Sequence, residues 1–122
     1  MSKVMLVEDD MTMLSLLTTL LEIEGFQVIS ALDEDPQAIL QQIHQEQPDL
    51  LLMDVNLRQL NGLDMLRLLR QDAQASSVRV IMSSGMDFRH ECLLAGATDF
   101  IMKPYMPDDL IDQIRQVLSR TQ

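Results

Sequence analysis

With 122 residues, 47% of them apolar, the chain has the size of one domain with a single hydrophobic core. Its formal charge of −10, from 19 acidic and 9 basic residues, disfavours direct binding to the phosphate backbone of nucleic acids. A single cysteine, no apolar segment of membrane-spanning length and no signal-peptide core favour a globular protein of the cytoplasm that does not bind membranes.

Five short apolar segments alternate with five helix-like segments along the chain. Strands are predicted at about residues 3–7, 26–30, 49–53, 78–83 and 98–102. Helices are predicted at about residues 11–24, from residue 36 onward, and at 62–71, 88–95 and 107–119, of which the fourth is short. Strict alternation predicts an α/β fold with a five-stranded parallel sheet, doubly wound, in a single domain over residues 1–122.

Charged residues follow three of the predicted strands. Glu8-Asp9-Asp10 follows the first strand, Asp54 closes the third, and Lys103 follows the fifth. Ligands of parallel sheets bind beyond the carboxyl ends of the strands, so we expect these side chains to converge there. Converging carboxylates require a cation, and Mg²⁺ prefers carboxylate oxygens and water as ligands.

The same edge of the sheet carries the groups that phosphoryl transfer needs. A carboxylate such as Asp54 can act as nucleophile toward phosphorus and form an aspartyl phosphate. Lys103 and a hydroxyl, either Ser83 or Ser84, could stabilise the charge on the transferring oxygens. The residues therefore predict a phosphoryl-accepting site.

These residues lie in motifs with a characteristic order. The motifs occupy residues 4–10, 49–54, 61–62, 80–85, 95–97 and 103–105. In this order the whole chain resembles the receiver domain of bacterial two-component response regulators. The resemblance implies a flavodoxin-like fold with strand order 2-1-3-4-5, and a phosphoacceptor signalling domain rather than an enzyme acting on a separate substrate. The phosphoryl donor would be a sensor histidine kinase or a histidine phosphotransfer protein.

The resemblance also implies the acceptor and the metal ligands. Asp54 matches the phosphoacceptor aspartate, and Glu8 and Asp9 match the acidic pair that holds Mg²⁺. Asp54 itself and the backbone carbonyl of Asn56 would complete the protein's share of the metal ligands.

Three further residues match positions that act after phosphorylation. Ser84 matches the hydroxyl that hydrogen-bonds the phosphoryl group, Lys103 the lysine that pairs with it, and Phe100 the aromatic switch. The implied switch changes the surface of the fourth helix, fifth strand and fifth helix. That surface would signal to a downstream protein or an attached output domain, or form a phosphorylation-dependent dimer. Only three residues follow the last predicted helix, so we expect no effector domain within this chain.

The chain departs from the family pattern at two places. The segment from Ser84 to Gly96 is shorter than usual by about one helical turn, which predicts a stubby fourth helix. Leu57-Arg58 replaces the frequent Met-Pro after the phosphoacceptor, and without the proline ring this loop loses a constraint on φ.

Several residues also have plainer interpretations. Phe100 could be an ordinary core residue, and the ten methionines are expected to fill gaps in the core. A methionine-lined partner surface, with Met86 and Met106 as candidates, is the alternative. His44 and His90 have no ligand spacing to each other and are expected on the surface.

Three rival functions deserve comparison. A flavin mononucleotide carrier could share the fold, but Glu8-Asp9-Asp10 would repel the ligand's phosphate. An Asp-nucleophile phosphatase of the haloacid dehalogenase type would carry an Asp-x-Asp arrangement that ends the first strand, whereas Asp54 ends the third. A degenerate receiver that binds partners without phosphorylation would not need a complete set of acids, Ser84 and Lys103.

Overall fold

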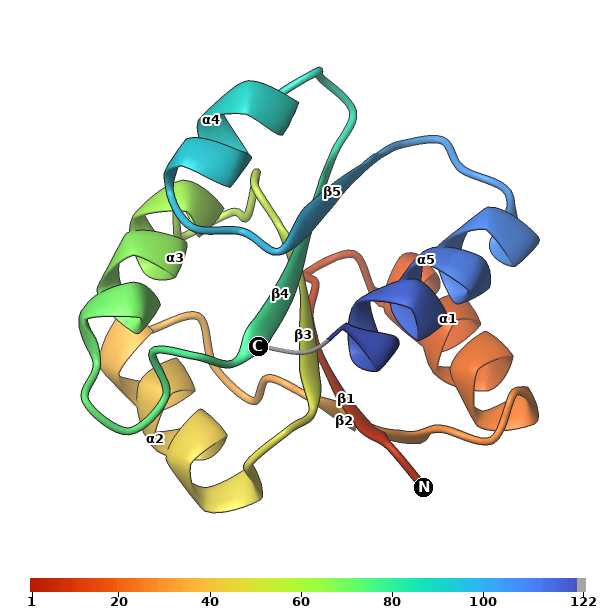
Figure 1. The fold of residues 1–122 in the computed structure, drawn as a ribbon, viewed down its shortest axis with the longest axis horizontal. Coiled ribbons are helices and arrows are strands. Elements are labelled where there is room, and N and C mark those ends of the chain that lie inside the picture. Colours follow the sequence, from red (N-terminus) through yellow and green to blue (C-terminus); the bar gives the residue numbers. More distant parts are fainter. Residues whose placement is uncertain (121–122) are drawn as a thin grey trace.

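The computed structural model describes residues 1–120, which form five strands and five helices in strict alternation (Figure 1). The strands are β1 (Lys3–Val7), β2 (Gln27–Ser30), β3 (Leu50–Asp54), β4 (Arg79–Ser84) and β5 (Asp99–Met102). The helices are α1 (Met11–Ile23), α2 (Pro36–Glu46), α3 (Gly62–Gln71), α4 (Arg89–Leu94) and α5 (Pro107–Ser119). The predicted α/β alternation is confirmed.

The five strands form one parallel sheet in the order β2-β1-β3-β4-β5. Val4 of β1 pairs with Val28 on one side and with Leu50 on the other. The chain thus moves outward from β1 to β2 and then returns past β1 to β3. The carboxyl ends of β1 and β3 lie at this switch in strand order, which is where such sheets bind ligands.

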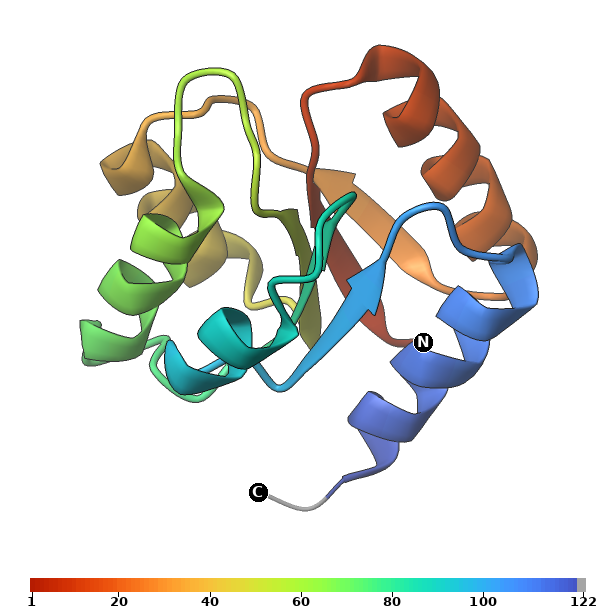
Figure 2. The same ribbon diagram turned by 90° about the horizontal axis from the view of Figure 1, so that it is seen from above.

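Helices cover both faces of the sheet. α1 and α5 pack on one face, and α2, α3 and α4 on the other (Figures 1 and 2). Side chains alternate between the faces, so neighbouring strand residues serve two separate core clusters. The α1/α5 cluster contains Val4, Leu6, Leu50, Leu52, Ile81 and Ile101, and the other cluster contains Met5, Val7, Leu51, Met53, Met82 and Phe100. Burial on both faces explains why the strands read as continuous apolar runs.

Capping side chains begin the helices that flank the switch point. The carboxylate of Asp10 accepts a hydrogen bond from the backbone N–H of Met13, and Asn61 caps α3 through the N–H groups of Leu63 and Asp64. Asp10 is therefore engaged as the N-cap of α1. None of the helices within residues 1–120 is long and apolar enough to cross a membrane.

α4 has only six residues, which confirms the expected short fourth helix. Its N-cap residue, Phe88, makes no capping hydrogen bond through its side chain. Instead, Arg89 ties the helix to β5: its guanidinium forms an ion pair with Asp99 at 3.4 Å and donates to the carbonyl of Phe100 at 3.1 Å. The position of α4 thus depends on contacts with β5 more than on its own caps.

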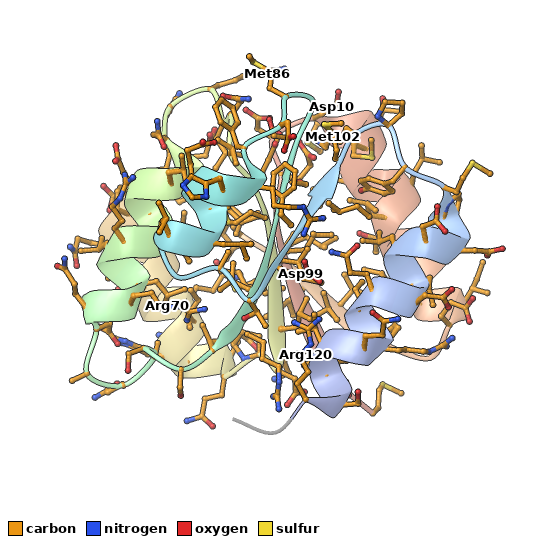
Figure 3. All side chains as sticks on the ribbon, turned by 45° about the horizontal axis from the view of Figure 1, so that its top comes forward. Asp10, Arg70, Met86, Asp99, Met102 and Arg120 are labelled. Carbon is orange, nitrogen blue, oxygen red and sulfur yellow. The ribbon has the colours of Figure 1, made fainter. Side chains whose placement is uncertain are left out.

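One expectation about individual side chains needs correction. Half of the ten methionines do not fill the core: Met1, Met11, Met86, Met102 and Met106 are exposed, whereas Met5, Met53, Met65 and Met82 are buried. Figure 3 shows Met86 and Met102 at the same end of the sheet as Asp10.

His44 is partly exposed, with 31% of its side chain accessible, and it makes a contact that the sequence does not predict. Its Nε2 lies 2.7 Å from Oδ2 of Asp72, which follows α3. This bond lowers the pKa of Asp72, whose carboxylate also accepts the backbone N–H groups of Gln74 and Ala75. The pair joins α2 to the end of α3.

Candidate functional site

Three carboxylates meet at the switch point of the sheet. Glu8 and Asp9 directly follow β1, Asp54 ends β3, and each offers an oxygen within 4.8 Å of the others. Their convergence follows from the register, since Val7 pairs with Met53 and so places the next residues of both strands side by side. The structure therefore brings together the three acids that the sequence predicted as metal ligands.

Lys103 reaches this cluster from the end of β5. Its Nζ lies 3.0 Å from Oε1 of Glu8 and 3.3 Å from Oδ2 of Asp54. Its backbone N–H donates to the carbonyl of Ser84 and so continues the β4–β5 ladder, which fixes the base of the side chain. Three carboxylates and one ammonium leave two negative charges in excess when all four groups are ionised, so the site can still take up a cation.

Burial shifts the pKa values of Asp54 and Lys103. Burial raises the pKa of Asp54, and the charge of Glu8 adds to this, against the opposing effect of Lys103. Desolvation alone would lower the pKa of Lys103, but its bonds to Glu8 and Asp54 outweigh that effect and raise it. The site thus holds a basic, poorly solvated carboxylate beside a lysine that stays protonated at neutral pH, which suits nucleophilic attack on phosphorus.

The two candidate hydroxyls lie on opposite faces of the sheet. Ser83 pairs with Asp54 in register and faces α1 and α5 with it, whereas Ser84 faces the same core cluster as Phe100. The Oγ of the fully buried Ser84 accepts hydrogen bonds from the backbone N–H of Met86 at 3.1 Å and from Nδ2 of Asn56 at 3.3 Å. Ser84 therefore joins the loops that follow β3 and β4.

Phe100 lies in the core with only 1% of its surface exposed. The guanidinium of Arg89 lies 5.8 Å from the centre of its ring, and both Arg89 and Gln113 donate to its backbone carbonyl. Its burial fits an ordinary core residue and also the inward starting position of a switch. The switch role of Phe100 stays a prediction.

The loop of residues 55–61 is held close to the site by two contacts that the sequence does not predict. The N–H of Gly62 donates to the carbonyl of Val55, and a Cβ at Gly62 would lie 2.2 Å from the carbonyl oxygen of Asp54. Only glycine fits this approach without a backbone shift. The N–H of Arg58 donates to Oδ2 of Asp9 at 2.6 Å. Recognising that arginine, unlike proline, supplies an N–H at this position could have revealed the second contact.

The donor set fits Mg²⁺. Carboxylate oxygens are the hard ligands that this ion prefers, and sites of one or two carboxylates completed by water are common. Glu8, Asp9 and Asp54 supply the carboxylates at suitable proximity. The backbone carbonyl of Asn56 stays a predicted ligand.

The fold and the site together define a class, the flavodoxin-like α/β domains that carry an acidic site at the switch point of the sheet. Residues 4–115 match the family model of the response regulator receiver domain. The chain belongs to this family, whose function is phosphorylation-dependent signalling and whose members interact with kinases and output domains.

Curated relatives and solved structures agree with this assignment. The chain is 39% identical to the transcriptional regulatory protein CpxR of Escherichia coli (strain K12), over 99% of the chain and 51% of CpxR. It is 34% identical to the DNA-binding response regulator MtrA of Mycolicibacterium paratuberculosis, over 97% of the chain and 52% of MtrA. The chain thus spans about half the length of the curated relatives it matches.

Two solved structures of similar length share the fold. A putative response regulator from Chloroflexus aurantiacus J-10-fl superposes with a TM-score of 0.88 at 27% identity, covering 98% of both chains. The receiver domain of the Francisella response regulator 1452 superposes with a TM-score of 0.87 at 27% identity, covering 100% of both chains. The predicted strand order 2-1-3-4-5 is confirmed.

Proposed function

We propose that residues 1–122 act as one receiver domain that accepts a phosphoryl group on Asp54. The donor is the phosphohistidine of a sensor histidine kinase or a histidine phosphotransfer protein. One observation carries the proposal: Asp54 is a buried carboxylate whose Oδ2 lies 3.3 Å from Lys103, beside two more carboxylates at the switch point. In this proposal the chain catalyses its own phosphorylation and dephosphorylation only.

The transfer itself follows from the positions of three side chains. A carboxylate oxygen of Asp54 attacks phosphorus and forms a P–O bond, while the P–N bond of phosphohistidine breaks and its electron pair returns to the imidazole. Lys103 pairs with the phosphoryl oxygens. The Ser84 oxygen already accepts two hydrogen bonds, which leaves its own O–H to donate to the phosphoryl group. Mg²⁺ held by Glu8, Asp9, Asp54 and the Asn56 carbonyl would neutralise charge on the phosphoryl oxygens.

An apolar groove beside the site suits the phosphoryl-donating protein. The groove has a volume of about 340 Å³. It is lined by Met13, Leu16, Leu17 and Leu20 of α1 and by the segment after β5: Lys103, Pro104, Tyr105 and Pro107. Leu16 is 63% exposed, and Lys103 lines both the groove and the acidic site. A donor protein seated on this groove is therefore next to Asp54.

The output surface is proposed to be that of α4, β5 and α5. Asp99 of β5 pairs with Arg89 of α4 and with Arg120, which follows α5, each at 3.4 Å. Movement of Phe100 would disturb this network, because Arg89 contacts both its ring and its carbonyl. The recipient is a downstream protein, an attached output domain or a second copy of the chain in a phosphorylation-dependent dimer. The net negative charge of the chain itself disfavours direct DNA contact by this domain.

Chemical phosphorylation tests the proposal. Wild type, Asp54→Asn and Asp49→Asn are incubated with acetyl phosphate and Mg²⁺, and their intact masses are measured. We expect a single phosphoryl adduct in the wild type and none in Asp54→Asn. Asp49→Asn is the control, because Asp49 lies at the opposite end of the motif of residues 49–54, and it should also form a single adduct. No adduct in the wild type would favour the degenerate receiver, and rapid multiple turnover of acetyl phosphate would favour the phosphatase.

A further inference from the structure

Two backbone groups of the β3–α3 loop bind carboxylates at the rim of the acidic site. The N–H of Arg58 donates to Oδ2 of Asp9 at 2.6 Å, and the N–H of Gln59 donates to Oε1 of Glu34 at 3.3 Å. The guanidinium Nε of Arg58 lies 3.9 Å from the same Asp9 oxygen. Hydrogen bonds to ionised acceptors are stronger than neutral ones, so this loop is held on the acidic rim by charge.

The Asp9 carboxylate that Arg58 engages belongs to the cluster that fits a divalent cation. Asp9 is largely buried, with 15% of its side chain exposed, whereas 79% of the Arg58 side chain is exposed. A cation bound by Asp9 would therefore meet both a donor that already occupies one of the two carboxylate oxygens and a positive charge at short range. Because the side chain is exposed, the charge effect is modest and is screened by salt.

We propose that Arg58 determines the cation affinity of the site: it is a tethered positive charge that competes with a divalent cation for Asp9 and weakens Mg²⁺ binding to the unphosphorylated protein. This inference rests on the proposed metal site. The effect depends on the charge of the side chain, since any residue except proline keeps the backbone N–H. Lysine at position 58 should therefore preserve it, and a neutral or acidic residue should remove or reverse it.

Mg²⁺ titrations of the wild type and four variants test this inference. Binding is followed by the fluorescence of Tyr105, the single tyrosine in a chain without tryptophan, and by the rise in thermal stability with Mg²⁺ concentration. At an ionic strength of about 0.01 M we expect Arg58→Gln to bind Mg²⁺ about two- to fivefold more tightly than the wild type. Arg58→Glu should bind more tightly still, and Arg58→Lys like the wild type.

The control is Arg67→Gln, which removes the same charge from an exposed ion pair with Asp64 on α3 and should bind like the wild type. The difference between Arg58→Gln and the wild type should shrink at about 0.3 M salt. A wild type that binds no Mg²⁺ contradicts the metal site and hence the proposed function. The role of Arg58 is overturned if the wild type binds Mg²⁺ with the same affinity as Arg58→Gln at low salt, or if Arg67→Gln gains as much Mg²⁺ affinity as Arg58→Gln. Either result leaves the metal site and the proposed function in place.

Discussion

Nζ of Lys103 lies 3.3 Å from Oδ2 of Asp54, and the same ammonium contacts Glu8 at 3.0 Å. One lysine from the end of β5 thus neutralises carboxylates that end or follow two other strands. Both carboxylates are largely withdrawn from water, so neither can replace the lysine by hydration. This contact makes the stability of the resting domain depend on the residues proposed for its chemistry.

Replacement of Lys103 by methionine should destabilise the domain. The change keeps most of the side-chain volume but leaves Glu8 and Asp54 facing each other without a counter-charge, at an expected cost of about 1–3 kcal/mol near neutral pH. Urea denaturation measures the change in the free energy of unfolding. Lys3→Met, which breaks a more exposed pair with Glu46, is the control and should cost about 1 kcal/mol or less. Equal stability of Lys103→Met and wild type would show that the contacts of Lys103 with Glu8 and Asp54 contribute nothing to the free energy of unfolding.

Asp54→Asn should stabilise the domain without Mg²⁺, in a pH-dependent way. Burial raises the pKa of Asp54 in the folded state above its ordinary value of 3.8, so the folded protein holds this proton more tightly than the unfolded chain. The ionised carboxylate therefore costs stability, and the cost grows as pH rises from 3.8 through the folded pKa. Asparagine removes it, with an expected gain of about 0.5–2 kcal/mol at neutral pH.

Thermal or urea unfolding from pH 4 to pH 8, at about 0.1 M salt to limit long-range charge effects, checks the sign of this effect. The stability difference between Asp54→Asn and wild type should be small at the acidic end and full at the neutral end. An asparagine variant that is less stable than wild type at neutral pH would mean that the ion pair with Lys103 outweighs burial.

The sequence predicts most of the site because the site lies at strand ends. Once five strands alternate with helices, Glu8, Asp54 and Lys103 must approach one another at the carboxyl edge of the sheet, and they do. The contact of Arg58 with Asp9 depends on the path of an irregular loop, which no periodicity encodes. The bond between His44 and Asp72 was missed for a similar reason, since it joins positions 28 residues apart at the ends of two helices.

Gly62→Ala should displace the backbone of Asp54 and Val55 and so disturb the site. A Cβ at this position would lie 2.2 Å from the Asp54 carbonyl oxygen and 2.8 Å from the Cα of Val55, both of which are backbone atoms. We expect a loss of about 1–3 kcal/mol in the free energy of unfolding and slower phosphorylation by acetyl phosphate. Gly85→Ala is the matched control, because nothing lies within 4 Å of its added Cβ. If both variants unfold at the same denaturant concentration, close packing at Gly62 is not the constraint.

Ser84→Ala should slow phosphorylation more than Ser83→Ala. Loss of a hydrogen bond to a charged phosphoryl group predicts a decrease of about ten- to hundredfold in the rate with acetyl phosphate and Mg²⁺. Ser83 shares the face of Asp54 and is therefore the direct rival of Ser84, but its replacement should have little effect on this rate if Ser84 is the donor. Single-turnover rates from intact mass spectra compare the two variants, and circular dichroism verifies that both are folded. A larger defect in Ser83→Ala would transfer the role to that hydroxyl.

The most direct measurement identifies the modified residue in the phosphorylated wild type. Borohydride reduces an acyl phosphate but not an ordinary carboxylate, so an aspartyl phosphate is converted to homoserine at its own position in the chain. The wild type is treated with acetyl phosphate and Mg²⁺, reduced, and sequenced as peptides by mass spectrometry. We predict homoserine at position 54, with Glu8 and Asp9 unchanged. Homoserine at another position, or a phosphoryl adduct with Asp54 intact, would contradict the assignment of Asp54 as the phosphoacceptor.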